Sequence, residues 1–249
     1  MAGHSKWANI KHRKGRQDAK RGKLFAKLAK TIEVAAREGG GNPEFNPTLS
    51  TAVDKAKAAD MPNDNIERAI KRGTGEIEGA VYEEMYYEGY GPGGVALYVH
   101  ILTDNRNRAA SDVRSTFTRF NSSLGEPGSV GYLFNQKGVI LASGSEEKVM
   151  LTALDAGAED VRDAGSGMFE VVTEPSDLQG VREALATSGV GIESADVTQL
   201  PSTLVPVEES DAKRLLRLID ALDDLDDVQE VYSNYDIDDS VMEKALAEA

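Results

Sequence analysis

The sequence predicts an α+β protein of three domains: an N-terminal three-helix domain followed by two α/β-sandwich domains of ferredoxin-like type. Up to residue 75, apolar residues recur at helical spacing. After residue 75, short apolar runs alternate with single amphipathic helices, which is typical of antiparallel sheets covered by helices. With 249 residues, the chain is long enough for two or three domains, each with its own core.

The N-terminal domain, residues 1–75, is predicted to contain three helices. The first spans about Asp18–Glu38, because its apolar residues form one stripe and three glycines follow it. The second opens at Asn46-Pro47, where asparagine suits the cap and proline suits the first helical position. The third is a short helix over Pro62–Gly73.

In the remaining chain, an apolar run, a polar break and an amphipathic helix follow one another four times. The runs predicted as strands are Val95–Leu102, Val139–Ala142, Phe169–Thr173 and Leu204–Val207. The apolar stripes of the four helices include Val113 and Phe117, then Val149, Leu151 and Leu154, then Val181 and Leu185, then Leu215 and Ile219. Acidic and hydroxyl side chains at each helix start are expected to cap free backbone N–H groups.

Extra strands at Tyr82–Glu88 and Val228–Tyr232 complete the two sheets. Domain boundaries are expected at Gly125–Gly131 and Pro201–Pro206. Residues 132–204 would then form an inserted domain. Residues 205–249 would return to complete the middle domain begun by residues 76–131.

Charge is distributed very unevenly along the chain. The net charge is −14, yet residues 1–75 hold 16 basic against 8 acidic residues, and residues 76–249 hold 12 against 34. Residues 1–30 contain ten Lys and Arg and only one acid, Asp18. Such an asymmetry favours a basic arm for nucleic acid on an acidic body. The alternative of a targeting segment is disfavoured by the interrupting glycines and the scarcity of serine.

The arm supplies most of the candidate nucleic-acid-binding residues. They are the cationic side chains and the single tryptophan of this segment: Lys6, Trp7, Lys11, His12, Arg13, Lys14, Arg16, Lys20, Arg21 and Lys23. Cationic groups attract phosphates without reading sequence, and an indole can stack on an unpaired base. In the alternative interpretation, Trp7 packs on the first helix and the charges are merely solvated.

A second basic group of residues interrupts the acidic body, and Arg106 and Arg108 are its candidate binding residues. Arg114 and Arg119 follow on the same predicted helix. Arginines at a helix start do not complement the helix dipole, so another interaction must account for them. They either pair with local acids or extend the surface that contacts nucleic acid.

No catalytic, metal or cofactor site is predicted. The chain has no cysteine, which fits a reducing cytoplasm, and no apolar stretch near the roughly eighteen residues that a membrane span needs. Gly89, Gly91 and Gly94 match the spacing of a dinucleotide fingerprint, but a hairpin turn is expected there, because a strand follows instead of a helix. The acidic cluster Asp223–Asp227 lacks the pattern of a calcium loop and is interpreted as a solvated helix end.

Several segments together resemble the YebC family. They are Met1–Lys14, Asp60–Ile70, Tyr87–Gly94, Thr103–Arg108 and Gly128–Phe134. The resemblance implies a bacterial, three-domain protein without cofactor or small-molecule substrate, related to a mitochondrial translational activator. One departure lies at Asn121–Leu124, where the family often has Gly-Gly-Asn-Leu. Asn121 can still adopt the left-handed conformation of a helix cap, so the fold is expected to persist.

The resemblance also implies two functions. One is a translation factor that binds ribosomal RNA near the peptidyl-transferase region through the arm and relieves stalling at consecutive prolines. The other is a transcriptional regulator that binds promoter DNA. The lone Trp7 and the acidic body favour the ribosome, since a long duplex would meet a repulsive field. The protein is expected to be a cytoplasmic monomer that regulates rather than catalyses.

Overall fold

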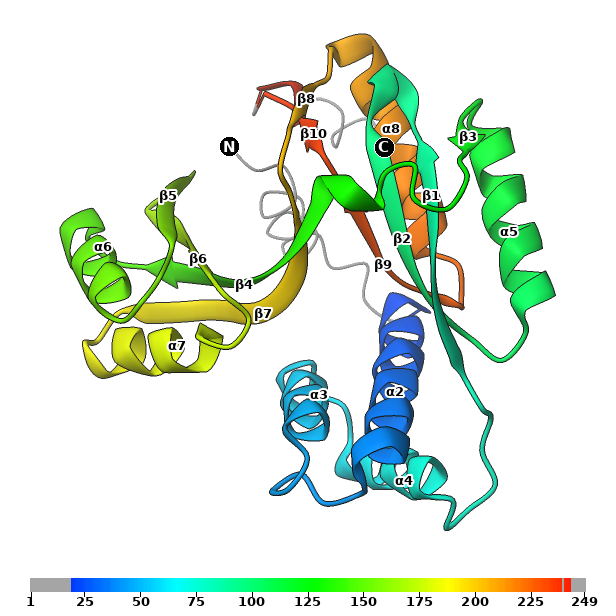
Figure 1. The fold of residues 1–249 in the computed structure, drawn as a ribbon, viewed down its shortest axis with the longest axis horizontal. Helices are drawn as coiled ribbons and strands as arrows, with labels where there is room; N and C mark the ends of the chain where they lie inside the picture. Colours follow the sequence, from blue (N-terminus) through cyan, green and yellow to red (C-terminus); the bar gives the residue numbers. More distant parts are fainter. Residues whose placement is uncertain (1–18, 239, 243–249) are drawn as a thin grey trace.

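Three helices begin the described part of the chain (Figure 1), and their bounds agree closely with those expected from the sequence. The computed structural model describes residues 19–238 and 240–242. Helix α2 spans Ala19–Gly39, α3 spans Pro47–Ala58 and α4 spans Asn63–Thr74. They enclose a small core that includes the buried side chains of Ile32, Leu49 and Ile66.

Asn46 fixes the connection between the first two helices. Its Oδ1 accepts a hydrogen bond from the backbone N–H of Leu49 at 3.1 Å, which is the predicted cap. Its Nδ2 also donates to the carbonyl oxygens of Ala35 at 2.8 Å and Gly40 at 2.9 Å. One buried side chain therefore satisfies backbone groups at the end of α2 and at the start of α3.

The first sheet has the strand order β3-β1-β2-β9, with every neighbouring pair antiparallel. Its strands are β1 (Glu83–Tyr90), β2 (Ala96–Thr103), β3 (Ser123–Leu124) and β9 (Val228–Ser233). Helices α5 (Arg106–Arg119) and α8 (Glu209–Asp223) cover one face. Strand β9 pairs with β2, so a segment near the C-terminus completes a sheet begun more than a hundred residues earlier.

The second sheet lies between these segments in the sequence and has the order β5-β6-β4-β7. Its strands are β4 (Phe134–Ser143), β5 (Asp160–Gly165), β6 (Met168–Thr173) and β7 (Gly191–Pro201). Helices α6 (Glu146–Asp155) and α7 (Leu178–Thr187) pack on one face around Ile140 and Val171. A short 3₁₀ turn, η1 (Pro92–Gly94), connects β1 to β2, and another, η2 (Gly131–Leu133), precedes β4 where the chain passes from the first sheet to the second.

Three sequence predictions are wrong in detail. Leu204–Val207 does not join a main sheet. Only β8 (Val205–Pro206) forms there, in parallel with β10 (Tyr235–Asp236). Leu151 and Leu154 of α6 are 58% and 47% exposed, because Val149 and Ala153 supply the buried stripe of that helix. No side-chain cap bond forms at α6, α7 or α8, whereas Asn105 caps α5.

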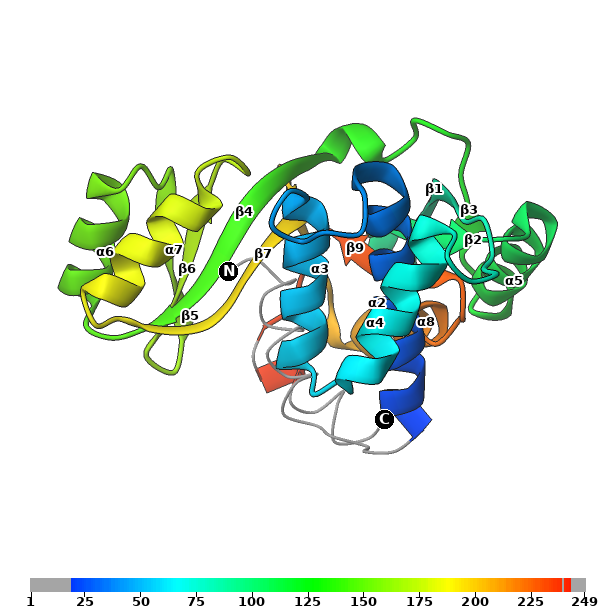
Figure 2. The same cartoon turned by 90° about the horizontal axis from the view of Figure 1, so that it is seen from below.

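The N-terminal helices contact both sheet units. In Figure 2, α3 lies beside β7, and Lys55 Nζ is 2.7 Å from Asp196 Oδ1. Helix α2 reaches the turn between α8 and β9 through several lysines. The positions of the three parts thus depend on ionic contacts between segments far apart in sequence.

Candidate nucleic-acid interface

The described structure begins at the base of the predicted basic arm. Seven of the candidate residues lie outside the described residues: Lys6, Trp7, Lys11, His12, Arg13, Lys14 and Arg16. Lys20 belongs to the first turn of α2, and its side chain also lies outside the described part. The arm therefore leads directly into α2, whose first turns carry Arg21 and Lys23.

Arg21 and Lys23 make different contacts. The guanidinium of Arg21 lies over the ring of Phe25, 5.4 Å from its centroid, on an exposed side of α2. Lys23 Nζ donates to the backbone carbonyl of Asp224 at 2.8 Å and lies 3.9 Å from its carboxylate. Arg21 is thus available to a partner, whereas Lys23 is already used within the protein.

Lys23 is the first member of a group that we call the lysine–aspartate cluster: Lys23, Lys27 and Lys30 of α2 with Asp223, Asp224, Asp226 and Asp227. Lys27 Nζ donates to the carbonyl of Asp223 at 2.8 Å and to its carboxylate at 3.0 Å. Lys30 Nζ donates to the carbonyl of Asp226 at 2.8 Å and to Asp227 Oδ1 at 2.9 Å. Spacings of four and three residues place the lysines on one face of α2. They meet the C-terminal end of α8, where the helix dipole favours cations.

Asp227 is the buried centre of this cluster, with a side chain only 6% exposed. Besides Lys30, it binds Arg108, whose Nε and Nη2 donate to Oδ2 at 3.0 and 2.8 Å. Burial raises the pKa of Asp227, but hydrogen bonds from Lys30 and Arg108 outweigh it and lower the pKa below its usual value. The interpretation of Asp223–Asp227 as a solvated helix end is therefore wrong for Asp223 and Asp227, which the α2 lysines cover, whereas Asp224 and Asp226 are exposed.

Of the two predicted arginines of the body, Arg108 has a clear structural partner. Hydrogen bonds to Asp104, at 2.7 Å, and to Asp227 raise the pKa of its guanidinium. Arg106 is more exposed and lies 3.4 Å from Glu83. For both residues, the structure shows the pairing with local acids that the sequence left as one alternative.

The glycine-rich segment Gly125–Gly131 is held by a single carboxylate, that of Glu88. The Glu88 carboxylate accepts hydrogen bonds from the backbone N–H groups of Gly128 at 2.7 Å, Val130 at 2.6 Å and Gly131 at 2.7 Å. Burial raises the pKa of Glu88, but these three bonds outweigh it, and the pKa lies below its usual value. The role of Glu88 could not be found from sequence, since its partners are backbone groups 40 or more residues away.

The hairpin Tyr90–Gly94 packs against the protein. Pro92 is buried, and a Cβ added at Gly91 would lie 3.0 Å from Leu215 Cδ1 of α8. The Tyr90 hydroxyl donates to the carbonyl of Ser129 at 2.9 Å. The turn links β1 to β2 as expected, instead of opening a helix for a dinucleotide. Asn121 adopts a positive φ of 53°, the left-handed conformation expected for it.

The described residues contain no group of three or more His, Asp or Glu side chains arranged to hold a metal ion. No helix within these same ranges has the length and apolar content of a membrane span. Of the three histidines, His4 and His12 lie outside the described residues. His100 is on β2 with Nε2 2.7 Å from Glu84 Oε1.

Comparison with known proteins identifies the family of this chain. The "TACO1/YebC protein N-terminal domain" matches residues 5–76, and the "TACO1/YebC second and third domain" matches residues 82–235. The chain belongs to the TACO1/YebC family. A relative from Frankia casuarinae is 58% identical over 98% of each chain. One from Geobacter sulfurreducens is 54% identical over 99% of this chain and all of its own.

Both of these TACO1/YebC relatives are named "Probable transcriptional regulatory protein". The crystal structure of a conserved hypothetical protein from Aquifex aeolicus matches with a TM-score of 0.80 at 49% identity. That match covers 89% of this chain and 93% of the other. The family resemblance and the α+β fold predicted from sequence are confirmed.

Proposed function

We propose that this chain is a non-enzymatic regulator of translation that binds ribosomal RNA through its basic arm and relieves stalling at consecutive prolines. The observation that carries the proposal is the separation of charge: ten basic residues and one acid in residues 1–30, on a body with a net charge of −22 over residues 76–249. A segment of this charge supplies affinity for phosphates, and Trp7 adds a stacking surface for an unpaired base.

The lysine–aspartate cluster sharpens this proposal. Lys23, Lys27 and Lys30 are engaged with the turn after α8, so they contribute less to an external contact than their number suggests. The binding charge then belongs to the residues before them, from Lys6 to Arg21. Such a short arm suits a crevice in folded RNA, because the acidic body can remain outside.

A DNA-binding transcriptional regulator is the second candidate, and the names of the relatives favour it. Phosphate attraction is common to both functions and cannot distinguish them. A long duplex, however, would extend past the arm toward the acidic body, where like charges repel it. The ribosome is therefore the partner that we propose first.

Co-sedimentation with ribosomes, beside binding to promoter-length duplex DNA, tests the choice. The test variant is the full chain with Lys11→Gln, Arg13→Gln and Lys14→Gln. Its control carries Lys57→Gln, Arg68→Gln and Lys71→Gln, three exposed cations of α3 and α4. We expect the arm variant alone to lose ribosome binding. Tighter binding of the unaltered chain to duplex than to ribosomes, or equal loss in both variants, would rule the proposal out.

A further inference from the structure

Helix α5 carries an unusual share of the positive charge of the acidic body. Residues 76–249 contain 12 basic residues, and four of them are the arginines of this 14-residue helix, which has one acid, Asp112. Arg106 and Arg108 face Glu83, Asp104 and Asp227, as described above. The two remaining arginines, Arg114 and Arg119, need another explanation.

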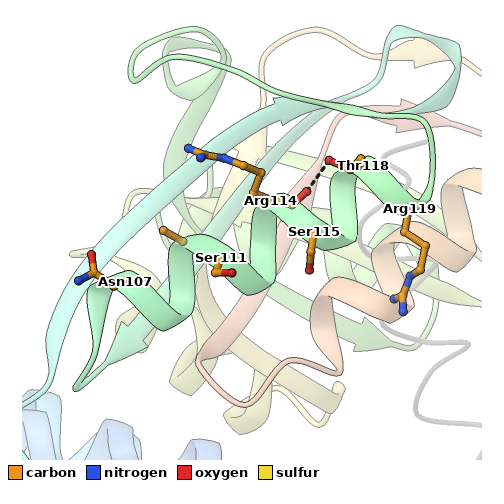
Figure 3. A pocket seen from close by; sticks show the side chains of 7 residues that line it. Asn107, Ser111, Arg114, Ser115, Thr118 and Arg119 are labelled. Carbon is orange, nitrogen blue, oxygen red and sulfur yellow. Dashed lines mark hydrogen bonds between the residues drawn. The ribbon is translucent and has the colours of Figure 1, made fainter.

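Neither of these two guanidiniums has a carboxylate partner within the described chain. Arg114 makes no side-chain hydrogen bond or ion pair there, and Arg119 only lies over the ring of its neighbour Phe120, 5.2 Å from the centroid. Both residues are exposed. In Figure 3 they leave α5 on opposite sides of a shallow hollow along the outer surface of the helix.

The lining of this hollow is polar and free of acids. Besides the two arginines, the hollow is lined by exposed hydrogen-bonding side chains and one half-buried alanine: Asn107, Ala110, Ser111, Ser115 and Thr118. Hydroxyl, amide and guanidinium groups are the side chains that usually contact phosphate and sugar oxygens. Since α5 rises about 1.5 Å per residue, Arg114 and Arg119 are separated by roughly 7.5 Å along its axis. At 3.6 residues per turn, the five-residue spacing also turns the two side chains about 140° apart around the axis, so each would contact a different phosphate of a strand that lies across the helix.

We infer that the outer face of α5 is a second nucleic-acid contact, which binds the phosphodiester backbone of RNA through Arg114 and Arg119. The inference rests on the proposed function and adds an anchor far from the arm in sequence. Charge complementarity selects this occupant, because an arginine pair without carboxylate partners among the described residues is out of place on a body of net charge −22. The contact positions RNA without reading its sequence, since it involves no base edge.

The test compares two full-length double variants in ribosome binding over a range of salt concentrations. The first carries Arg114→Gln and Arg119→Gln. The control carries Lys148→Gln and Arg182→Gln, two exposed cations of α6 and α7, and therefore has the same net charge. We expect the α5 variant to bind more weakly, with a salt slope smaller by about 1 for each arginine. The control variant should match the unaltered chain.

Three results would overturn the inference. The first is unchanged ribosome binding by the α5 variant while the arm variant loses it, which would leave the proposed function intact. The second is an equal loss in the control variant, which would reduce the effect to net charge. The third is tighter binding of an acidic peptide than of a ribosomal RNA fragment, abolished by the α5 substitutions, which would make the partner a protein. If the unaltered chain does not bind ribosomes at all, the proposed function itself fails.

Discussion

Glu88 shows how one buried carboxylate can organise the backbone of a loop. Its two carboxylate oxygens accept hydrogen bonds from three backbone N–H groups within 2.7 Å, and the loop residue Val130 is fully buried. Hydrogen bonds to an ionised acceptor are stronger than neutral ones, and each donor left unpaired costs its desolvation. The segment between the two sheet units is thus held by these polar bonds together with the apolar cluster of Val130, Phe134 and Tyr232.

Glu88→Gln should lower the free energy of unfolding by about 1–3 kcal/mol. The amide nitrogen cannot accept, so at least one of the three N–H groups loses its partner. Urea denaturation followed by circular dichroism measures the change. Glu126→Gln, an exposed residue of the same loop, serves as the control and should leave the midpoint unaltered. Equal stability of the two variants would contradict the role given to Glu88.

The lowered pKa of Asp227 predicts how the stability of the protein changes at acidic pH. Its pKa in the folded protein is below the unfolded value, so its contribution is fully present above about pH 4–5 and is lost as pH falls further. We therefore expect the free energy of unfolding to decrease below about pH 4–5, and Asp227→Asn to show a smaller decrease over the same range. Urea titrations at several pH values measure both slopes. Identical slopes would show that Asp227 does not carry the acid sensitivity.

A substitution of Trp7 distinguishes stacking of its indole on a base from packing of the indole on the first helix. If the indole stacks on an unpaired base, Trp7→Ala should weaken ribosome binding by about 1–3 kcal/mol and leave thermal stability unchanged. Binding and melting temperature are measured on the same preparation, with Phe45→Ala as a control, since Phe45 is an aromatic residue 82% exposed outside the arm. If the Trp7 variant binds ribosomes as well as the unaltered chain, the indole does not stack on a base, and the alternative that it packs on the first helix is favoured.

At the scale of elements, α2 is both the end of the arm and a structural clamp. Its lysines bind backbone carbonyls and carboxylates of the turn after α8, and the Lys30 and Asp227 side chains are 15% and 6% exposed. Ion pairs of such burial are screened by salt far less than surface pairs. The clamp therefore fixes α2 against the turn after α8.

Lys30→Gln should destabilise the protein by about 1–2 kcal/mol, because Asp227 stays buried with Arg108 as its remaining cationic partner. The matched change Lys57→Gln, at an exposed position of α3, should have almost no effect. Urea denaturation of the two variants measures the difference in their free energies of unfolding. If both variants unfold at the same urea concentration, the clamp does not contribute to stability.

The elements differ in how far sequence could predict them. Helix α3 was evident, since Asn46-Pro47 and an apolar stripe specify it locally. Strand β7 was missed because Glu193, Asp196 and Thr198 give it a mostly polar sequence, with one face of the strand away from the core. The clamp could not be predicted either, since Lys27 and Asp223 are 196 residues apart. Likewise, the sequence does not reveal that Arg108, unlike Arg114, binds Asp227, because the two residues are 119 positions apart.

For the whole molecule, the separation of charge predicts a steep response of binding to salt. If about six phosphates are contacted in single-stranded RNA, the logarithm of affinity should fall with the logarithm of salt with a slope near −4. Titration of ribosome binding at several potassium chloride concentrations measures this slope. A flat response would remove the electrostatic basis of the proposed function, whichever nucleic acid is the partner.

The pairing of β9 with β2 also determines when the protein can finish folding. During synthesis, the N-terminal helices and the whole second sheet emerge before residue 228, whereas the first sheet still lacks its fourth strand. Until then, β2 has an open edge of unpaired N–H and C=O groups, which can recruit strands from other chains. A copy terminated before residue 228 would therefore be an aggregation hazard, and completion of the first sheet has to wait for β9.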